Sequence, residues 1–162
     1  MMIPENQATY EKWMRLALEE AKKAFDEGEV PVGAVLVRDT DDTLLATGRN
    51  RREVLRHALA HAEMEALDGG CRTLGGWRLP HCTLYVTLEP CPMCAGAIHN
   101  ARIDRVVFGA ADQNNGACGS KFSMNEVYYN HKTQVIGGVL EAECSALMNA
   151  FFEKLRARRK KA

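Results

Sequence analysis

The sequence predicts an α/β protein in which helices cover both faces of a mixed β-sheet. Two β-rich segments, residues 30–37 and 43–48, flank an aspartate-rich turn and are expected to form a hairpin. Further along, the apolar segments 82–87 and 103–109 have the length and composition of buried strands, with a helix-like segment between them. A hairpin followed by alternating strands and helices is typical of a mixed sheet packed between helical layers.

The first expected helix lies near the N-terminal end of the chain. Apolar residues recur there at intervals of four, the spacing of one helix face: Trp13, Ala17, Ala21 and Phe25. We expect this helix to cover about residues 9–28 and to end near Gly28. Residues 60–68 fit a second, shorter helix, which we expect Gly69 and Gly70 to stop.

The second half of the chain continues the alternation and then becomes less regular. Residues 91–100 predict a helix between the two buried strands, residues 110–130 a polar loop with a short helix, and residues 135–139 a weaker strand. Apolar residues at helical spacing then mark one face of a final helix: Cys144, Met148, Phe151 and Leu155.

Length and composition indicate one globular domain over residues 1–162. Hydrophobic residues make up 46% and charged residues 26% of the chain, as is usual for a protein with its own core. The chain has no apolar run near the roughly 18 residues that a membrane helix needs, and its N-terminus lacks the pattern of a secretory signal. We therefore expect a cytoplasmic protein without membrane contact and without a disulfide framework.

The C-terminal helix end, residues 154–162, concentrates positive charge. It contains six basic residues and no acidic one, whereas the whole chain has 21 of each kind. Without these six, the rest of the chain has 15 basic against 21 acidic residues, a net charge of −6. Two interpretations are open: an arm that binds nucleic-acid phosphates, or a solvated helix end whose cations offset the helix macrodipole.

Two short segments, His61-Ala62-Glu63 and Pro90-Cys91-Pro92-Met93-Cys94, carry the strongest chemical signal. Zinc favours imidazole and thiolate ligands, and a catalytic zinc site combines three protein ligands with an open position for water. Cys91 and Cys94, three residues apart at an expected helix start, can direct both sulfurs at one ion. The positive end of that helix favours thiolates. His61 supplies the third ligand from the start of another helix.

Glu63 is expected to act beside the metal and not on it. Residues two apart on a helix do not face the same way, so Glu63 should reach a metal-bound water when His61 holds the metal. Zinc lowers the pKa of such a water to roughly 7, and a neighbouring carboxylate can carry its protons to a substrate. A lone cysteine pair also occurs in structural zinc sites, but this chain has no second pair at that spacing.

His-Ala-Glu followed by Pro-Cys-Pro-Met-Cys resembles the signature of the cytidine/deoxycytidylate deaminase superfamily. Further segments are similar to the bacterial tRNA-specific adenosine deaminases within it: residues 29–37, 83–90, 105–110, the run PCPMCAGAIHNARI and the loop GAADQNNGACGS. The similarity extends over nearly the whole chain. It implies a three-layer α/β/α sandwich around a five-stranded mixed sheet, and homodimers whose sites are completed by both subunits.

The resemblance also implies roles for individual residues. His61, Cys91 and Cys94 would be the zinc ligands, and Glu63 the proton carrier. Asn50 corresponds to the asparagine that hydrogen-bonds the bound base.

Other positions bear on the binding of RNA. Asp112 corresponds to a residue near the ribose or backbone of the flipped nucleotide, although an exposed loop aspartate is an equally simple interpretation. The chain departs from the family at His57-Ala58-Leu59, where Asp-Pro-Thr is frequent, and at Asn114, where a lysine would offer a phosphate contact. Phe152 lies off the apolar face of the last helix. It either stacks on an unpaired base or makes a core or dimer contact.

The activity implied is zinc-dependent hydrolysis of adenosine to inosine at the wobble position of a tRNA anticodon, with the stem-loop held by the basic tail. One alternative is a related deaminase of a free base or nucleoside, of the guanine or cytosine type, which would need no basic arm. Another is a non-catalytic, zinc-stabilised RNA-binding module. Glu63 argues against the latter, because a structural zinc site has no use for a non-ligand acid.

Overall fold

The computed structural model describes residues 4–128 and 130–162. Across these residues, a five-stranded sheet has the strand order β2-β1-β3-β4-β5. Strand β1 pairs antiparallel with β2 and with β3, whereas β3, β4 and β5 run parallel, so the sheet is mixed as predicted. The strands are β1 (Gly33–Arg38), β2 (Thr43–Arg49), β3 (Cys82–Leu88), β4 (Arg105–Ala110) and β5 (Gln134–Ile136).

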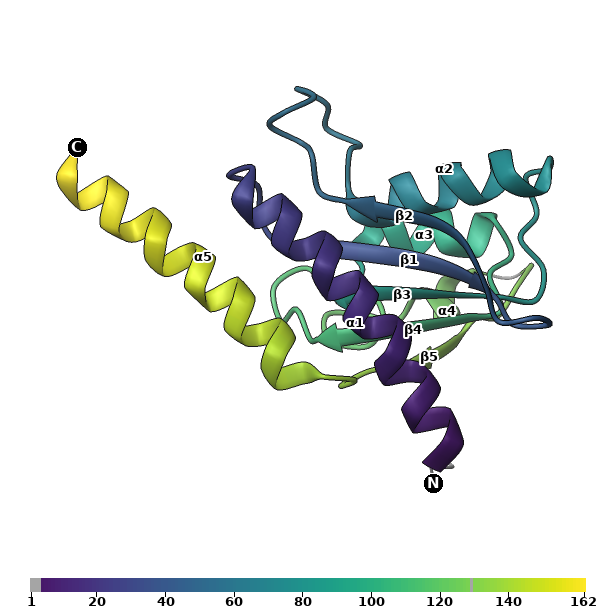
Figure 1. Ribbon diagram of the computed structural model, residues 1–162. Coiled ribbons are helices and arrows are strands. Elements are labelled where there is room, and N and C mark those ends of the chain that lie inside the picture. Colours follow the sequence, from purple (N-terminus) through teal and green to yellow (C-terminus); the bar gives the residue numbers. More distant parts are fainter. Residues whose placement is uncertain (1–3, 129) are drawn as a thin grey trace.

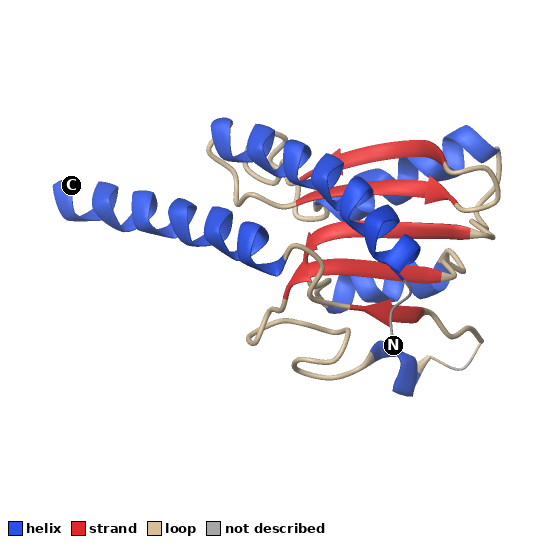
Figure 2. Ribbon diagram, turned by 60° about the horizontal axis from the view of Figure 1, so that its bottom comes forward, coloured by secondary structure: helices blue, strands red, loops and turns tan. Residues whose placement is uncertain are grey.

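Helices cover both faces of this sheet in three layers (Figures 1 and 2). Helix α1 and the start of α5 pack on one face, and α2 and α3 pack on the other. The predicted α/β/α sandwich is therefore confirmed. The helices are α1 (Pro4–Asp26), α2 (Ala62–Leu74), α3 (Pro92–Asn100), α4 (Met124–Val127) and α5 (Glu141–Lys161).

Strand β1 shows why the central strands are apolar throughout. Its side chains alternate between the two faces of the sheet, as in any strand. Ala34 and Leu36 belong to the core shared with α2 and α3, whereas Val35 and Val37 belong to the core shared with α1. All four side chains are buried. The apolar run at residues 30–37 is thus the sequence of a strand that is covered on both sides.

The prediction that Gly69 and Gly70 stop the second helix is wrong. Helix α2 runs through both glycines to Leu74, and Gly75, with a φ of 74°, forms its left-handed C-cap. The glycine pair lets the helix approach the sheet closely. A Cβ on Gly70 would lie 2.2 Å from the side chain of Leu36. The absence of a side chain at Gly70 therefore allows the helix to pack closely on the sheet, whereas Gly75 is the glycine that terminates the helix.

The strand directions bring several loops to one edge of the sheet. Gly33 at the start of β1 pairs with Arg49 at the end of β2, and Leu88 and Ala110 pair at the ends of β3 and β4. The segments that continue from these ends therefore meet at this edge. In α/β proteins, ligands commonly bind where strands end in this way.

Helix α5 begins against β4 and then leaves the body of the molecule (Figure 1). Cys144 near its start is buried. Further along, the ring of Phe151 packs edge-on against Phe25 of α1, with the ring centroids 6.0 Å apart. Residues 156–162 are exposed. Among the helices that the structure describes, none is long and apolar enough to cross a membrane.

Candidate active site

His61, Cys91 and Cys94 come together at the loop-bearing edge of the sheet. His61 Nδ1 lies 3.7 Å from Cys91 Sγ and 3.5 Å from Cys94 Sγ. In a tetrahedral zinc site, metal–ligand bonds of about 2.3 Å to sulfur and about 2.0 Å to nitrogen separate the two ligand atoms by about 3.5 Å. The observed distances therefore fit a shared zinc ion. Within the described residues, no other histidine, cysteine and acidic side chains are grouped to hold a metal.

Two helix starts produce this geometry. His61 is the N-cap of α2 and Cys91 is the N-cap of α3, each with an extended backbone. Side chains at the N-cap and at the third helical position lie close together, so Cys91 and Cys94 converge through local structure alone. Pro92 at the first helical position removes no helical hydrogen bond. Hydrogen bonds from Cys94 and from the His61 ring lower the pKa of the Cys91 thiol to about 4.

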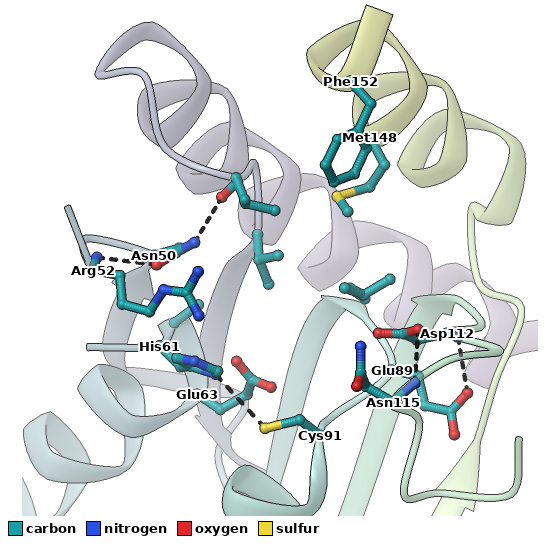
Figure 3. A pocket seen from close by; sticks show the side chains of 14 residues that line it. Asn50, Arg52, His61, Glu63, Glu89, Cys91, Asp112, Asn115, Met148 and Phe152 are labelled. Atoms are coloured by element: carbon teal, nitrogen blue, oxygen red, sulfur yellow. Dashed lines mark hydrogen bonds between the residues drawn. The ribbon is translucent and has the colours of Figure 1, made fainter. Parts of the chain in front are cut away.

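Glu63 lies beside these three side chains, in the first turn of α2. It is 4% exposed, and Figure 3 shows its side chain directed into the pocket between His61 and Cys91. Burial raises the pKa of Glu63 to about 7, because the charged form loses its hydration there. A carboxylate with a pKa near neutrality can both accept and release a proton at pH 7.

The pocket beside Glu63 has a volume of about 370 Å³, which is in the range of small-ligand sites. Asn50 and Arg52, which follow β2, form one wall (Figure 3). Met148 and Phe152 of α5 form the opposite wall. The pocket therefore combines a polar wall, an apolar wall and the candidate metal ligands on its floor.

Asn50 is buried at the wall of this pocket and oriented by the backbone. Its amide nitrogen donates to the carbonyl oxygen of Val30 at 3.2 Å, and its side-chain oxygen accepts the N–H of Arg52 at 3.1 Å. One of the two amide hydrogens is used in this way. The second is free, among the bonds of the described residues, to meet a ligand.

Asp112 also lines the pocket, and it organises its own loop. One carboxylate oxygen accepts the backbone N–H groups of Asn114 and Asn115, at 3.0 and 3.1 Å. Asn114 itself is exposed, as are residues 57–59, so both departures from the family lie on surface loops. Phe152 is 37% exposed and lines the pocket, whereas its neighbour Phe151 packs against α1.

Three further residues at this site were not identified from the sequence. Arg52 and Met148 line the pocket, and Glu89 is a buried carboxylate at its edge. The sequence places Met148 only on the apolar face of the last helix. Arg52 belongs to no motif in the sequence that distinguishes it from a surface arginine. The resemblance covered the segment around Glu89 but gave that residue no role.

The fold and the site together define a deaminase: a histidine–cysteine–cysteine group and a buried glutamate lie at a pocket in the size range of small-ligand sites. Residues 8–156 match the MafB19-like deaminase family. Over 153 residues the chain is 48% identical to the tRNA-specific adenosine deaminase of Bacillus subtilis (strain 168), and the match covers 94% of each chain. The chain belongs to the tRNA-specific adenosine deaminases.

Solved structures agree with this assignment. One comes from a study of A-to-I editing by tRNA:A34 deaminases at the wobble position of transfer RNA. It has a TM-score of 0.76 and 41% identity, covering 84% of this chain and 98% of the other. A guanine deaminase from Bacillus subtilis is similar at a TM-score of 0.58 and 35% identity, over 68% of this chain and 66% of its own.

Proposed function

We propose that the chain hydrolyses adenosine to inosine at the wobble position of a tRNA anticodon and releases ammonia. The observation that carries this proposal is Glu63, buried beside the His61–Cys91–Cys94 group at the floor of the pocket. The similarity to tRNA-specific adenosine deaminases supports the choice of adenosine in tRNA as the substrate.

Zinc is the metal that we assign to His61, Cys91 and Cys94. One imidazole and two thiolates form a ligand set that suits zinc, and the spacing of their ligand atoms fits its tetrahedral geometry. When bound, zinc would lower the pKa of a water molecule and so supply the nucleophile of the hydrolysis at neutral pH.

Glu63 is the proposed proton carrier. It would accept a proton from the attacking water as the oxygen bonds to carbon 6 of adenine, and pass this proton to the neighbouring ring nitrogen. The second proton of the water would then move through Glu63 to the exocyclic amino group as the C–N bond breaks. Water and adenosine thus become inosine and ammonia, and Glu63 ends in its starting state.

Asn50 and the α5 wall are proposed to hold the base. The free amide hydrogen of Asn50 would bind a base nitrogen, and Phe152 with Met148 would contact the base or its neighbour through apolar surface. Asp112 would lie near the ribose. Arg52 at the pocket wall and, outside the pocket, the basic end of α5 at residues 154–162 would contact phosphates of the stem-loop.

We further propose that residues 1–162 form a single deaminase domain and that the protein acts in the cytoplasm as a homodimer. The loop between β2 and α2 supports a self-contact, because it exposes three large apolar side chains next to the pocket: Val54, Leu55 and Leu59. Light scattering coupled to size exclusion would give the mass in solution. Replacing Leu55 with Glu should shift that mass toward the monomer.

Deamination of a free base is the second candidate function, and the similarity to a guanine deaminase favours it. One experiment separates the two. A tRNA pool would be incubated with the purified protein and sequenced for inosine, and parallel reactions would measure ammonia release from free guanine, cytosine and adenosine. Inosine at anticodon position 34, with no ammonia from the free compounds, would support the tRNA substrate. The opposite pattern would support the second candidate.

A further inference from the structure

Two buried carboxylates flank the pocket without belonging to the proposed chemistry. Glu29 precedes β1 and is 1% exposed, and Glu89 follows β3 and is 2% exposed. Neither forms an ion pair with any residue in the part of the chain that the structure describes. A buried carboxylate without a cation is costly unless hydrogen-bond donors surround it.

Backbone N–H groups of two loops donate hydrogen bonds to these carboxylates. The carboxylate oxygens of Glu29 accept the backbone N–H groups of Glu53 at 3.1 Å and of Val54 at 2.8 Å. These two residues lie on the loop that connects β2 to α2. The same loop carries Arg52 at the pocket wall and leads directly to the candidate ligand His61.

Glu89 makes the corresponding contacts on the other side of the pocket. Its oxygens accept the N–H groups of Asp112, Cys118 and Ser120 at 3.0–3.1 Å, and also the hydroxyl of Ser120. The loop approaches so closely that a Cβ on Gly116 would lie 2.3 Å from the Glu89 carboxyl group. Between the anchored amides this loop carries Asn115 into the pocket.

We propose that Glu29 and Glu89 are positioning residues, each of which fixes one of the two loops that form the rim of the substrate pocket. A loop that moved away would lose the hydrogen bonds between its N–H groups and its carboxylate, so each carboxylate opposes opening of its own loop. The side chains that the two loops offer to the substrate are thereby held in place before binding.

The test compares Glu89→Gln and Glu29→Gln in the zinc-loaded, full-length chain. Glutamine keeps the size of the side chain but removes the charge and turns one acceptor into a donor that faces other donors. Glu19→Gln, the same change on the exposed face of α1, is the matched control. Amide hydrogen exchange is followed residue by residue, together with zinc content, kcat and KM on an anticodon stem-loop.

We expect local loosening, with each variant affecting its own loop. The amides of residues 112, 118 and 120 should exchange about tenfold faster in Glu89→Gln, and those of residues 53 and 54 in Glu29→Gln. The strand amides of β3 and β4 should keep their protection, and zinc should stay bound. KM should rise about tenfold with kcat changed only a few-fold, because the rim binds substrate and Glu63 is untouched.

Equal loss of protection in the loops and the strands would overturn the proposal, because it would make the two carboxylates general core residues. Unchanged loop exchange, or a lower kcat at constant KM, would also overturn it. The KM measurement rests on the proposed function, whereas the exchange measurement does not, so inactivity of the wild type on RNA would count against that function alone. Should Glu89→Gln not fold, Gly116→Ala displaces the same loop from the other side and should give the same exchange pattern.

Discussion

Charged side chains are buried at the edge of the sheet that carries the candidate metal ligands, and they are exposed along the distal half of α5. At the edge, Glu29, Glu63 and Glu89 are almost completely buried, and the first and last are held by several donors. Along residues 156–162, the charges are exposed and form no ion pair within the described residues. Catalysis of bond making and breaking requires side chains that are held in position before the substrate binds. Attraction to RNA phosphates, in contrast, is possible with charged side chains that remain solvated.

The largest loss of activity is expected when one of the proposed metal ligands is removed. Metal analysis of the wild type should give near one zinc per chain, and Cys91→Ala or Cys94→Ala should lose most of the metal and all measurable turnover. Cys71→Ala, which changes a cysteine on α2 away from the group, is the control and should keep both. A fully active preparation without metal would contradict the proposed chemistry.

Replacing Glu63, the proposed proton carrier, should lower turnover less than replacing a proposed metal ligand. Glu63→Gln keeps the metal and the fold, but kcat should fall by about 10²–10⁴-fold, because the amide cannot carry a proton. Single-turnover rates on bound stem-loop and zinc content would be measured on the same samples, with Glu19→Gln as the exposed control. Loss of zinc in Glu63→Gln would instead identify Glu63 as a ligand.

Phe151 and Phe152 on α5 are expected to have different roles, Phe151 in the stability of the fold and Phe152 in RNA binding. Phe152→Ala should weaken stem-loop binding by about 1–3 kcal/mol if the ring stacks on a base, with little change in melting temperature. Phe151→Ala should lower the melting temperature and leave affinity nearly constant, because Phe151 packs against Phe25. The reverse result would place Phe152 in the core or at a subunit contact.

The smallest effect is expected from removal of residues 156–162. An exposed charge contact is worth roughly 0.2–1 kcal/mol, so KM for tRNA should rise a few-fold at physiological salt for each phosphate contact that is lost. The dependence of binding on salt should flatten by about 0.7–0.9 logarithmic units for each phosphate that the shortened helix no longer neutralises. Turnover of bound substrate should be unchanged. If affinity and salt dependence both stay as in the wild type, the tail is a solvated helix end.

Local patterns predicted more of the site than did patterns that depend on packing. Cys91 and Cys94 could be assigned because the start of one helix sets their geometry. Arg52 and Met148 could not, because only the strand order and the path of α5 bring them to one pocket.

The glycine pair in α2 shows a second limit of prediction from the sequence. Glycine favours both helix ends and close packing, and the sequence does not contain the distance from Gly70 to Leu36 that decides between the two. The three-layer sandwich was easier to predict from the sequence, because strand and helix periodicities repeat along the chain and each element indicates its own buried face.

The directions of the strands in the sheet also determine where a label can be attached. Arg38 pairs with Thr43 at the end of the β1–β2 hairpin opposite to the pocket, and the turn between them is exposed. Asp42 at the base of the turn accepts the indole N–H of Trp13, so the turn is firmly joined to α1. A fluorophore or affinity peptide introduced at Thr40 would sit a strand's length, about 20 Å, from the pocket. Such a tag would report on RNA binding while leaving the C-terminal helix end unmodified.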